Sequence, residues 1–214
     1  GPKYEHIGMM ADKLEAKSVA EKIGLPILPG SSKNVKFLSD AKKICKEIGY
    51  PILIKATNGG GGRGIKKVQK EEELKENFIL ARKEAEQSFG NDNVYLEKFI
   101  ENPRHIEVQI IGDQKGNIIH IGERECSIQR RSQKIIEECP SPGISKKERD
   151  YLTQISLEAM KKINYENLGT IEYLYSNGQF YFIEMNTRLQ VEHTITEEVF
   201  NLDIVKEQIN ISSG

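Results

Sequence analysis

The stretch 169–193, GTIEYLYSNGQFYFIEMNTRLQVEH, constrains the fold more than any other part of the chain. β-Branched and aromatic residues flank Ser176-Asn177-Gly178, a turn signal, so the stretch predicts a β-hairpin. If the hairpin closes symmetrically about Gly178, Glu172 and Glu184 face each other across the two strands. Directly opposed residues have Cβ atoms about 5 Å apart. Two carboxylates at that distance repel, so either one is protonated or a cation lies between them.

A metal ion is the interpretation that the neighbouring residues favour. Asn186 is two residues past Glu184, so it lies on the same face of the strand and adds a neutral oxygen. An oxygen-only set of ligands suits a hard cation, Mg²⁺ in particular. The alternative is an exposed hairpin face with scattered acidic residues, because registers inferred from sequence slip easily.

A glycine run, Gly59–Gly64, is the second strong feature, and it includes Gly60, Gly61, Gly62, Arg63 and Gly64. It matches G-x-G-x-x-G, but the strand-like Ile65–Val68 follows it, whereas a dinucleotide site needs a helix there. No Gly-Lys-Ser/Thr closes it, so it is not a P-loop. We therefore expect a flap between two strands. The cations Lys55 and Arg63 favour phosphate binding over a loop without function.

Composition sets outer limits on function. The chain has 214 residues, 37% hydrophobic and 29% charged, as expected for a globular protein. A net charge of -1 gives no footprint for nucleic acid, and no apolar run is long enough to span a membrane. The three cysteines, Cys45, Cys126 and Cys139, lack metal-ligand spacing and indicate reduced thiols in a cytosol-like compartment.

The order of elements is mixed. The spacing of apolar residues predicts a helix over 7–23, and we expect a short edge strand over 26–29. Several hairpins follow, and together these elements indicate an α+β fold with antiparallel sheets. The polar stretch Glu123–Lys134 is either a solvated loop or an anion site built from Arg130, Arg131 and Lys134. A glycine flap, lysines and an acidic cation site suit a nucleoside triphosphate with Mg²⁺, but they do not identify the acceptor.

Four runs carry a family resemblance. IKATNGGGGRGIKKV, VYLEKFIENPRHIEVQI, ERECSIQRRSQKIIEECPSPG and FIEMNTRLQVEHTITE resemble the biotin carboxylase component of acetyl-CoA carboxylase, in the ATP-grasp superfamily. The resemblance covers essentially the whole chain, and EMNTRLQVEH distinguishes it from carbamoyl-phosphate synthetases. It implies an α+β ATP-grasp fold, present as a central fragment with mixed or antiparallel sheets and a glycine-rich flap subdomain.

The resemblance also implies a reaction. ATP phosphorylates bicarbonate to carboxyphosphate, which releases CO₂ for transfer to N1′ of biotin, the first half-reaction of acetyl-CoA carboxylase in fatty acid synthesis. The implied cofactors are ATP and Mg²⁺ or Mn²⁺, with biotin as the carrier-bound substrate. The implied partners are a biotin carboxyl carrier protein, carboxyltransferase subunits and a second copy of the enzyme. Neither nucleic acid nor membrane is expected, and the location is cytoplasmic.

Site residues follow from the resemblance, position by position. The implied metal ligands are Glu172, Glu184 and Asn186. The implied ATP-phosphate contacts are Lys13 and Lys55, with the flap closing over them. Glu97, Lys98 and Ile100 match the adenine-side hinge, and His105 and Gln129 match nucleotide contacts. Lys134, Arg188, Gln190 and Val191 match the bicarbonate pocket, Glu192 matches the general base, and Arg188 also matches the group that stabilises the biotin enolate.

Physical chemistry agrees with two of these roles. Arg188 offers a planar fork suited to carboxylate-like anions, and Glu192, four residues on, lies near that cation, which favours its ionised form. The alternative is a surface ion pair worth under about 1 kcal/mol. Ser132 departs from the family, in which many members have histidine there, and a serine hydroxyl is shorter and uncharged.

The family pattern also predicts how the chain is divided. We expect a flap subdomain over about 28–99 and a partial grasp core over about 100–214, without the family's N-terminal Rossmann-like and C-terminal parts. Little or no carboxylase activity is expected from such a fragment alone. Two other hypotheses stay open, a nucleotide-binding module without chemistry and an ATP-grasp ligase with another carboxylate acceptor.

Overall fold

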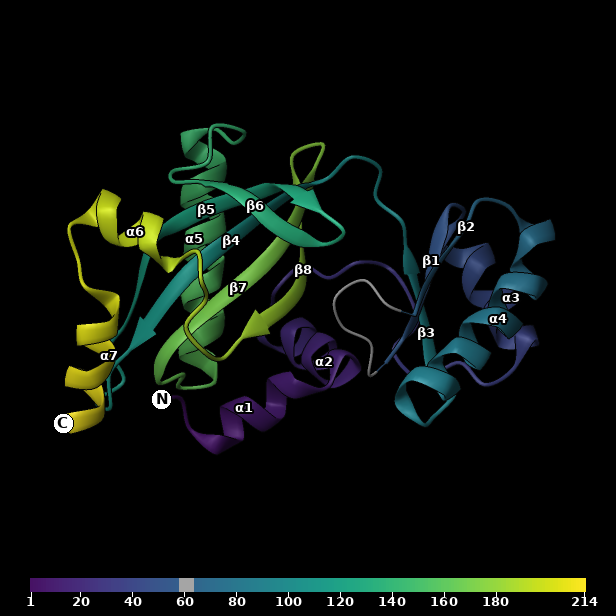
Figure 1. Cartoon of the computed structure of the whole chain (residues 1–214), viewed down its shortest axis with the longest axis horizontal. Coiled ribbons are helices and arrows are strands. Elements are labelled where there is room, and N and C mark those ends of the chain that lie inside the picture. The colour runs from purple at the N-terminus through teal and green to yellow at the C-terminus, as the bar shows by residue number, and fades with distance from the viewer. Residues whose placement is uncertain (58–63) are drawn as a thin grey trace.

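Two antiparallel sheets organise the chain (Figure 1). The structure is a computed structural model that describes residues 1–57 and 64–214. A three-stranded sheet has the order β2-β1-β3, and a five-stranded sheet has the order β6-β5-β4-β7-β8. Each sheet has its own apolar core, so the two can be considered in turn.

The small sheet consists of β1 (Ile52–Ala56), β2 (Ile65–Val68) and β3 (Val94–Lys98). Helices α3 (Leu38–Ile48) and α4 (Glu71–Phe89) pack on it, and the buried side chains of this core include Ile52, Ile54, Val68, Leu74 and Phe78. β1 and β2 pair antiparallel on either side of the glycine run, as the sequence predicts. The flap residues Gly60, Gly61, Gly62 and Arg63 lie outside the described residues.

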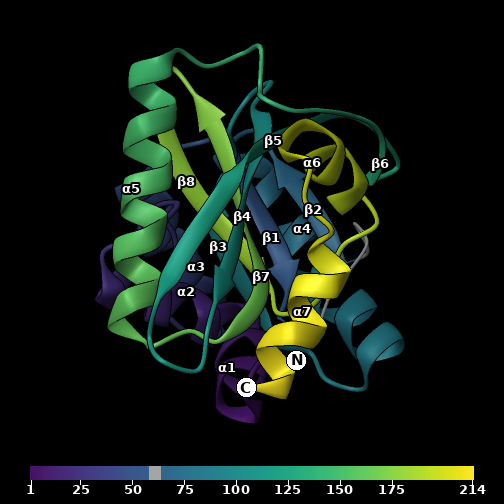
Figure 2. The ribbon, with the colours of Figure 1, turned by 90° about the vertical axis from the view of Figure 1, so that its left-hand side faces the viewer.

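The large sheet lies between two layers of helices (Figure 2). Its strands are β4 (Arg104–Gly112), β5 (Ile118–Arg130), β6 (Gln133–Glu138), β7 (Asn167–Ser176) and β8 (Gln179–Asn186). One face packs on α1 (Tyr4–Ala11), α2 (Lys13–Ile23) and α5 (Lys146–Lys162). α6 (His193–Phe200) and α7 (Ile204–Ser213) lie over the other face. None of the described helices is both long and apolar enough to cross a membrane.

The β7–β8 hairpin has the predicted pairing of Glu172 with Glu184, but it reaches that pairing differently. The turn is Asn177-Gly178, both with positive φ, and it pairs Ser176 with Gln179. Continued regularly, this register would place Ile183 opposite Glu172. An irregularity between Glu172 and Tyr173 shifts the register by one residue and brings Glu184 opposite instead. Closure about Gly178 was therefore wrong, although the pair that it predicted is confirmed.

Two other predicted elements differ from the structure. The single helix over 7–23 is broken at Asp12, whose carboxylate accepts from the backbone N–H groups of Leu14 and Glu15 and so starts α2. The edge strand over 26–29 is replaced by isolated bridges, of Ile27 with Phe182 and of Gly30 with Glu97. These bridges tie the segment to both sheets.

The polar stretch Glu123–Lys134 is not a solvated loop. β5 continues through Arg130, and its residues Glu123–Cys126 are buried in the middle of the large sheet. The polar composition does not indicate a loop here, because this sheet buries charged side chains against one another.

Candidate functional site

A cavity of about 510 Å³ lies beside the β7–β8 hairpin. Most of the predicted site residues line it, and they come from separate elements of the large sheet and its helices: Lys13, His105, Gln129, Lys134, Glu172, Glu184, Asn186, Arg188, Gln190, Val191 and Glu192. Ser132, in the turn between β5 and β6, lines it too. The structure thus brings together residues that are dispersed along the sequence.

Glu172 is the buried centre of this cavity wall, with 5% of its surface exposed. Its Oε1 accepts from Asn186 Nδ2 at 2.9 Å, from Gln190 Nε2 at 2.7 Å and from Lys134 Nζ at 3.0 Å. His105 Nε2 lies 2.8 Å from its Oε2. Burial alone would raise the pKa of Glu172, but His105 and Lys134 outweigh it and lower that pKa to about 2. The carboxylate is therefore ionised at neutral pH.

Lys134 joins three carboxylates from different elements. Its ammonium lies 2.5 Å from Glu107 Oε2 and 3.0 Å from Glu172 Oε1, and it also donates to Glu192, which precedes α6. Burial would lower the pKa of Lys134, but Glu107 and Glu172 outweigh it and raise that pKa. Burial by itself would raise the pKa of Glu192, but the hydrogen bond and charge of Lys134, a backbone hydrogen bond and the charge of Arg124 together outweigh it, so the net shift of that pKa is downward.

The ionised Glu192 expected from the sequence thus agrees with the structure, but the cation expected beside it does not. That cation is Lys134 and not Arg188. Arg188 instead donates to the carbonyl of Leu189 at 3.1 Å. The reason is topological: β6 carries Lys134 across the sheet to Glu192, a contact that spacing along the chain cannot reveal.

Arg124 and Glu107 are site residues that the sequence analysis missed. Arg124 has 0% of its surface exposed, and its Nε donates to Glu107 Oε1 at 2.6 Å. Its Nη1 donates to Gln109 and Thr196, and its Nη2 donates to Gln190 Oε1 at 3.2 Å. Arg124 thereby orients Glu107, which holds Lys134, and Gln190, which holds Glu172. The available signal was cross-strand pairing, because Glu107 and Arg124 are direct partners between β4 and β5.

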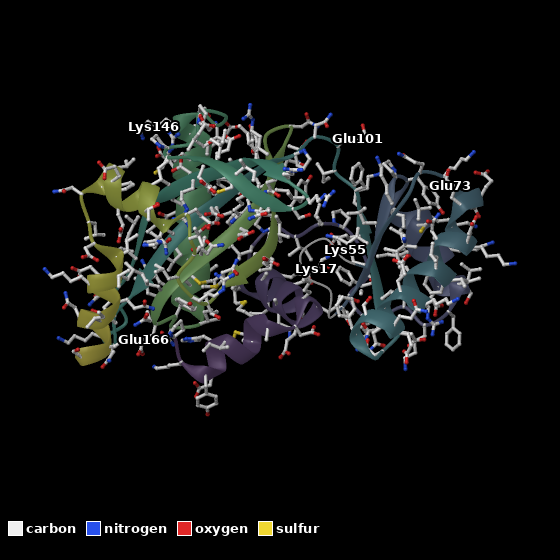
Figure 3. The ribbon with its side chains drawn as sticks, in the orientation of Figure 1. Lys17, Lys55, Glu73, Glu101, Lys146 and Glu166 are labelled. Carbon is white, nitrogen blue, oxygen red and sulfur yellow. The ribbon has the colours of Figure 1, made fainter. Side chains whose placement is uncertain are left out.

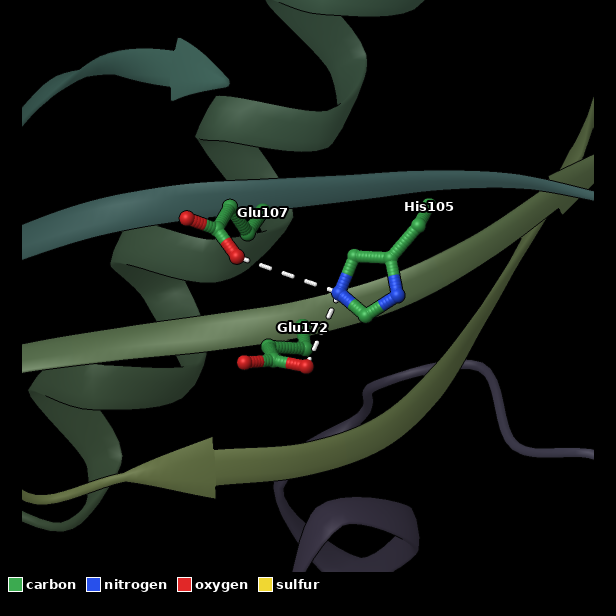
Figure 4. A group of neighbouring side chains, drawn as sticks. All are labelled: His105, Glu107 and Glu172. Atoms are coloured by element: carbon green, nitrogen blue, oxygen red, sulfur yellow. Dashed lines mark ion pairs between the residues drawn. The ribbon is translucent and has the colours of Figure 1, made fainter. Parts of the chain in front are cut away.

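His105, Glu107 and Glu172 form a compact group whose potential ligand atoms lie within 4.8 Å of one another (Figure 4). His105 Nε2 is 2.8 Å from Glu172 and 3.8 Å from Glu107. The ammonium of Lys134 and the guanidinium of Arg124 already neutralise these two carboxylates. This group therefore needs no metal ion to offset its charge.

The predicted metal ligands form a different group on the hairpin. Glu172 and Glu184 are paired across β7 and β8, and the Asn186 amide donates a hydrogen bond to Glu172. The oxygen atoms of these three side chains, which are potential metal ligands, therefore lie close together at the cavity. Lys13 Nζ lies 3.6 Å from Glu184 Oε2. Carboxylate and amide oxygens are suitable ligands for a hard divalent cation, so this set of donors fits Mg²⁺.

The nucleotide residues divide between the two sheets. In the large sheet, Gln129 Nε2 lies 3.3 Å from His105 Nδ1, so these two predicted contacts are neighbours. In the small sheet, Lys55 on β1 forms an ion pair with Glu97 on β3. The Lys98 side chain donates to the carbonyls of Gly49 and Tyr50, and its backbone N–H donates to the carbonyl of Pro29 at 2.8 Å.

Two further predicted contacts belong to the small sheet. Ile100 follows the end of β3 and is partly exposed, and Gly64, at φ +70°, directly precedes β2. Lys55, Glu97, Lys98, Ile100 and Gly64 are not among the residues that line the 510 Å³ cavity.

Comparison with known proteins identifies the family. Residues 12–214 match the family described as carbamoyl-phosphate synthase L chain, ATP binding domain. The chain is 51% identical over 218 residues to a biotin carboxylase of Allochromatium vinosum, and it spans 100% of its own length but 48% of that protein. It is 50% identical over 214 residues to a pyruvate carboxylase of Bacillus subtilis, of which it covers 19%.

A solved structure agrees over the whole chain. It is the biotin carboxylase domain dimer of the 2-oxoglutarate carboxylase of Hydrogenobacter thermophilus, in complex with MgADP, ADP and bicarbonate. The TM-score is 0.94 at 49% identity, covering 100% of this chain and 48% of that one. These matches confirm the α+β ATP-grasp fold and the resemblance to biotin carboxylase. The chain therefore belongs to the carbamoyl-phosphate synthase L chain ATP-binding domain family.

Proposed function

We propose that this chain is the ATP-binding part of a biotin carboxylase, which uses ATP and bicarbonate to carboxylate biotin on a carrier protein. The observation that carries the proposal is the contact of Lys134 with Glu192 in the same cavity wall as Glu172, Glu184 and Asn186. A module that only binds nucleotide needs the hairpin acids, but it does not need a second anion site beside a carboxylate base. The bicarbonate and MgADP bound by the Hydrogenobacter thermophilus domain support the same assignment.

In this proposal Glu172, Glu184 and Asn186 hold Mg²⁺ or Mn²⁺. A divalent cation held by these residues would supply positive charge that offsets the charge of the phosphates. Lys13 and Lys55 contact the phosphates under the glycine flap. His105 and Gln129 contact the nucleotide from the large sheet, and the hinge formed by Glu97, Lys98 and Ile100 contacts it from the small one.

Lys134, Arg188, Gln190 and Val191 would hold bicarbonate next to Glu192, the general base. A carboxylate bound to an ammonium is a weak base, since the cation stabilises its ionised form. Bicarbonate is itself an anion and competes with Glu192 for Lys134. Its arrival therefore weakens the hold of Lys134 on Glu192 and strengthens the base at the moment when a proton must move. Arg188 is exposed enough to stabilise the biotin enolate in turn.

The parent enzyme and its partners form the narrower part of the proposal. We place the chain in the biotin carboxylase of an acetyl-CoA carboxylase of fatty acid synthesis, as a homodimer that works with a carrier protein and carboxyltransferase subunits in the cytoplasm. Pyruvate carboxylase and 2-oxoglutarate carboxylase are similarly close relatives, so the molecule that accepts the carboxyl group from biotin depends on the carboxyltransferase. Purifying the full-length protein with its native partners and testing acetyl-CoA, pyruvate and 2-oxoglutarate as acceptors distinguishes these systems.

The decisive experiment substitutes Glu192 in the full-length enzyme. We expect Glu192→Gln to abolish bicarbonate-dependent ATP hydrolysis while MgATP binding, measured by calorimetry, persists. Glu198→Gln, at an exposed position of α6, the helix that Glu192 precedes, is the matched control and keeps the wild-type rate. Near-normal turnover of Glu192→Gln removes Glu192 from the role of base. Turnover with another carboxylate and none with bicarbonate would favour a different ATP-grasp ligase.

A further inference from the structure

Lys17, on α2, is partly buried, and its ammonium lies at the buried end of the side chain. Its Nζ is buried and, in the part of the chain that the structure describes, has no hydrogen-bond partner. It lines a cavity of about 250 Å³ together with the segment 27–32 that links the two sheets. An unpaired buried ammonium is costly, so a protein that keeps one has a use for it or loses stability by it.

The charges near Lys17 are Glu97 and Lys55, which we assign to the nucleotide site, and Glu21, an exposed residue one turn further along α2 that lines the same cavity. Glu97 has 5% of its surface exposed, and Lys55 is the side chain paired with it. Gly30, in the segment that lines the Lys17 cavity, bridges to Glu97, and a Cβ on Gly30 would lie 2.8 Å from Glu97 Cα. The cavity thus abuts the backbone of Glu97.

Lys17 is also within electrostatic reach of both groups. Burial lowers the pKa of Lys17 most strongly, the charge of Glu97 raises it and the charge of Lys55 lowers it. Figure 3 shows Lys17 and Lys55 at the junction between the two sheets. Two ammonium groups therefore share this junction with the buried carboxylate of Glu97, while the carboxylate of Glu21 lies at an exposed position of the same cavity.

The charge balance of this group changes when a nucleotide binds. In the structure Lys55 neutralises Glu97, and the ammonium of Lys17 has no hydrogen-bond partner among the described residues, so it is the surplus cation next to Glu97. A phosphate that attracts Lys55 would leave Glu97 buried without its partner, and removal of one partner from a buried ion pair is strongly unfavourable. With Lys17 at hand, the surplus cation can replace the one that the phosphate has taken.

We propose that Lys17 is a positioning residue for nucleotide binding, a reserve cation that pairs with Glu97 when phosphate draws Lys55 away. This role rests on the proposed function, because it requires Lys55 to contact nucleotide phosphate. In the free protein the same ammonium has the opposite effect, because an unpaired buried charge lowers the stability of the fold.

The test compares Lys17→Met with wild type in calorimetric titrations of MgATP and of adenosine. We expect the affinity for MgATP to fall by about tenfold or more, since Glu97 is left unpaired. Adenosine carries no phosphate and leaves Lys55 in place, so its affinity is expected not to change. The melting temperature of free Lys17→Met is expected to equal or exceed that of wild type, since methionine keeps the apolar stem and removes the unpaired charge.

Controls separate this role from a structural one. Lys17→Arg, which keeps the charge, restores MgATP affinity, and Lys22→Met, at an exposed position of the same helix, does not alter it. In a Glu97→Gln background, Lys17→Met no longer weakens MgATP binding, because there is no carboxylate to pair.

Two results would overturn the role of Lys17. The first is an unchanged MgATP affinity in Lys17→Met, and the second is an equal loss of affinity for MgATP and adenosine. If the wild-type chain binds no MgATP, the proposed function itself is contradicted. If the wild type binds MgATP and Lys17→Met binds it equally tightly, only the role of Lys17 as a reserve cation is contradicted.

Discussion

The two sheets of this protein bury different chemistry. The core of the small sheet is hydrocarbon, with Ile54, Leu74 and Phe78 essentially inaccessible to solvent, and Glu97 is the charged residue it buries among those described. The large sheet buries ions in its middle, where Arg124 and Glu107 are both 0% exposed. The same antiparallel architecture thus supports an apolar core in one sheet and a charged network in the other.

The difference lies in how many partners each buried carboxylate has. Among the residues that the structure describes, Glu172 in the large sheet contacts Lys134, Asn186, Gln190 and His105, whereas Glu97 in the small sheet is paired with Lys55. A satisfied polar network holds one geometry, because any displacement breaks several bonds at once. A carboxylate with one partner can exchange it. The large sheet is therefore suited to fixing reacting groups, and the small sheet to rearranging charge when a ligand arrives.

The largest predicted effect tests whether the buried network of the large sheet depends on its guanidinium. Arg124→Met takes from the buried Glu107 one of its two cations, leaving it with Lys134, and removes the donor to Gln190, so we expect a loss of about 3–5 kcal/mol in the free energy of unfolding. Urea denaturation measures it. Arg130→Met, at the exposed end of the same strand, is the control, with a change within about 0.5 kcal/mol. Comparable stabilities for the two variants would mean that the network is dispensable.

Much of the hairpin could be predicted from sequence, because its determinants are local. The turn residues and the alternation of apolar positions specify two strands, and they place Glu172 and Glu184 on facing positions. What spacing could not reveal was the irregularity next to Glu172, since a bulge depends on the packing of the whole sheet. The pairing was correct because two register errors of one residue cancelled.

The ion network could not be predicted, because its contacts join distant strands. Arg124 lies in a polar stretch whose composition is equally typical of a loop, and only the pairing of β4 with β5 places it opposite Glu107. Lys134 was predicted from the family resemblance, yet its contact with Glu192 spans 58 residues. Spacing along the chain instead suggested Arg188 as the partner of Glu192. The sequence thus predicted which residues belong to the site better than it predicted which of them contact one another.

The next prediction concerns the hydrocarbon core of the small sheet. Ile54→Ala removes a fully buried side chain from the centre of β1, so we expect a loss of about 2–5 kcal/mol from transfer and cavity costs. Hydrogen exchange should show lost protection in β1, β2 and β3 and retained protection in β4 and β7, because the two cores are separate. Ile65→Ala, with 39% of its surface exposed in wild type, serves as the mild control. Equal loss of protection in both sheets would show that they unfold as one unit.

A third prediction probes the junction between the sheets. A Cβ on Gly30 would lie 2.3 Å from the carbonyl oxygen of Leu96, so Gly30→Ala must push the linking segment away from β3. We expect a loss of about 1–3 kcal/mol, measured by thermal unfolding with calorimetry. Gly8→Ala is the matched control, since nothing lies within 4 Å of the added Cβ and alanine favours a helix by about 0.5–1 kcal/mol. Should Gly30→Ala be as stable as wild type, the segment is not held tightly against the small sheet.

The smallest predicted effect contrasts a buried charge with a partly buried one. Glu148, in the first turn of α5, is only partly buried, yet hydrogen bonds from Ser145 and then from Tyr175 lower its pKa to about 2, about as far as that of Glu172. Donors to the ionised form can therefore shift the pKa of a carboxyl group without full burial. Ser145→Ala breaks this capping box and is expected to cost about 1 kcal/mol at pH 7.

The pH dependence of Glu148 follows from the sign of its shift. Its pKa in the folded protein lies below its usual value of 4.5, so the ionised carboxylate contributes stability above pH 4.5. That contribution falls as the pH drops from 4.5 through about 2, where the folded form also takes up the proton. The stability difference between wild type and Glu148→Gln should therefore be constant above pH 5 and shrink in acid. A difference that is the same at pH 7 and pH 3 would show that Glu148 acts through its shape and not through its charge.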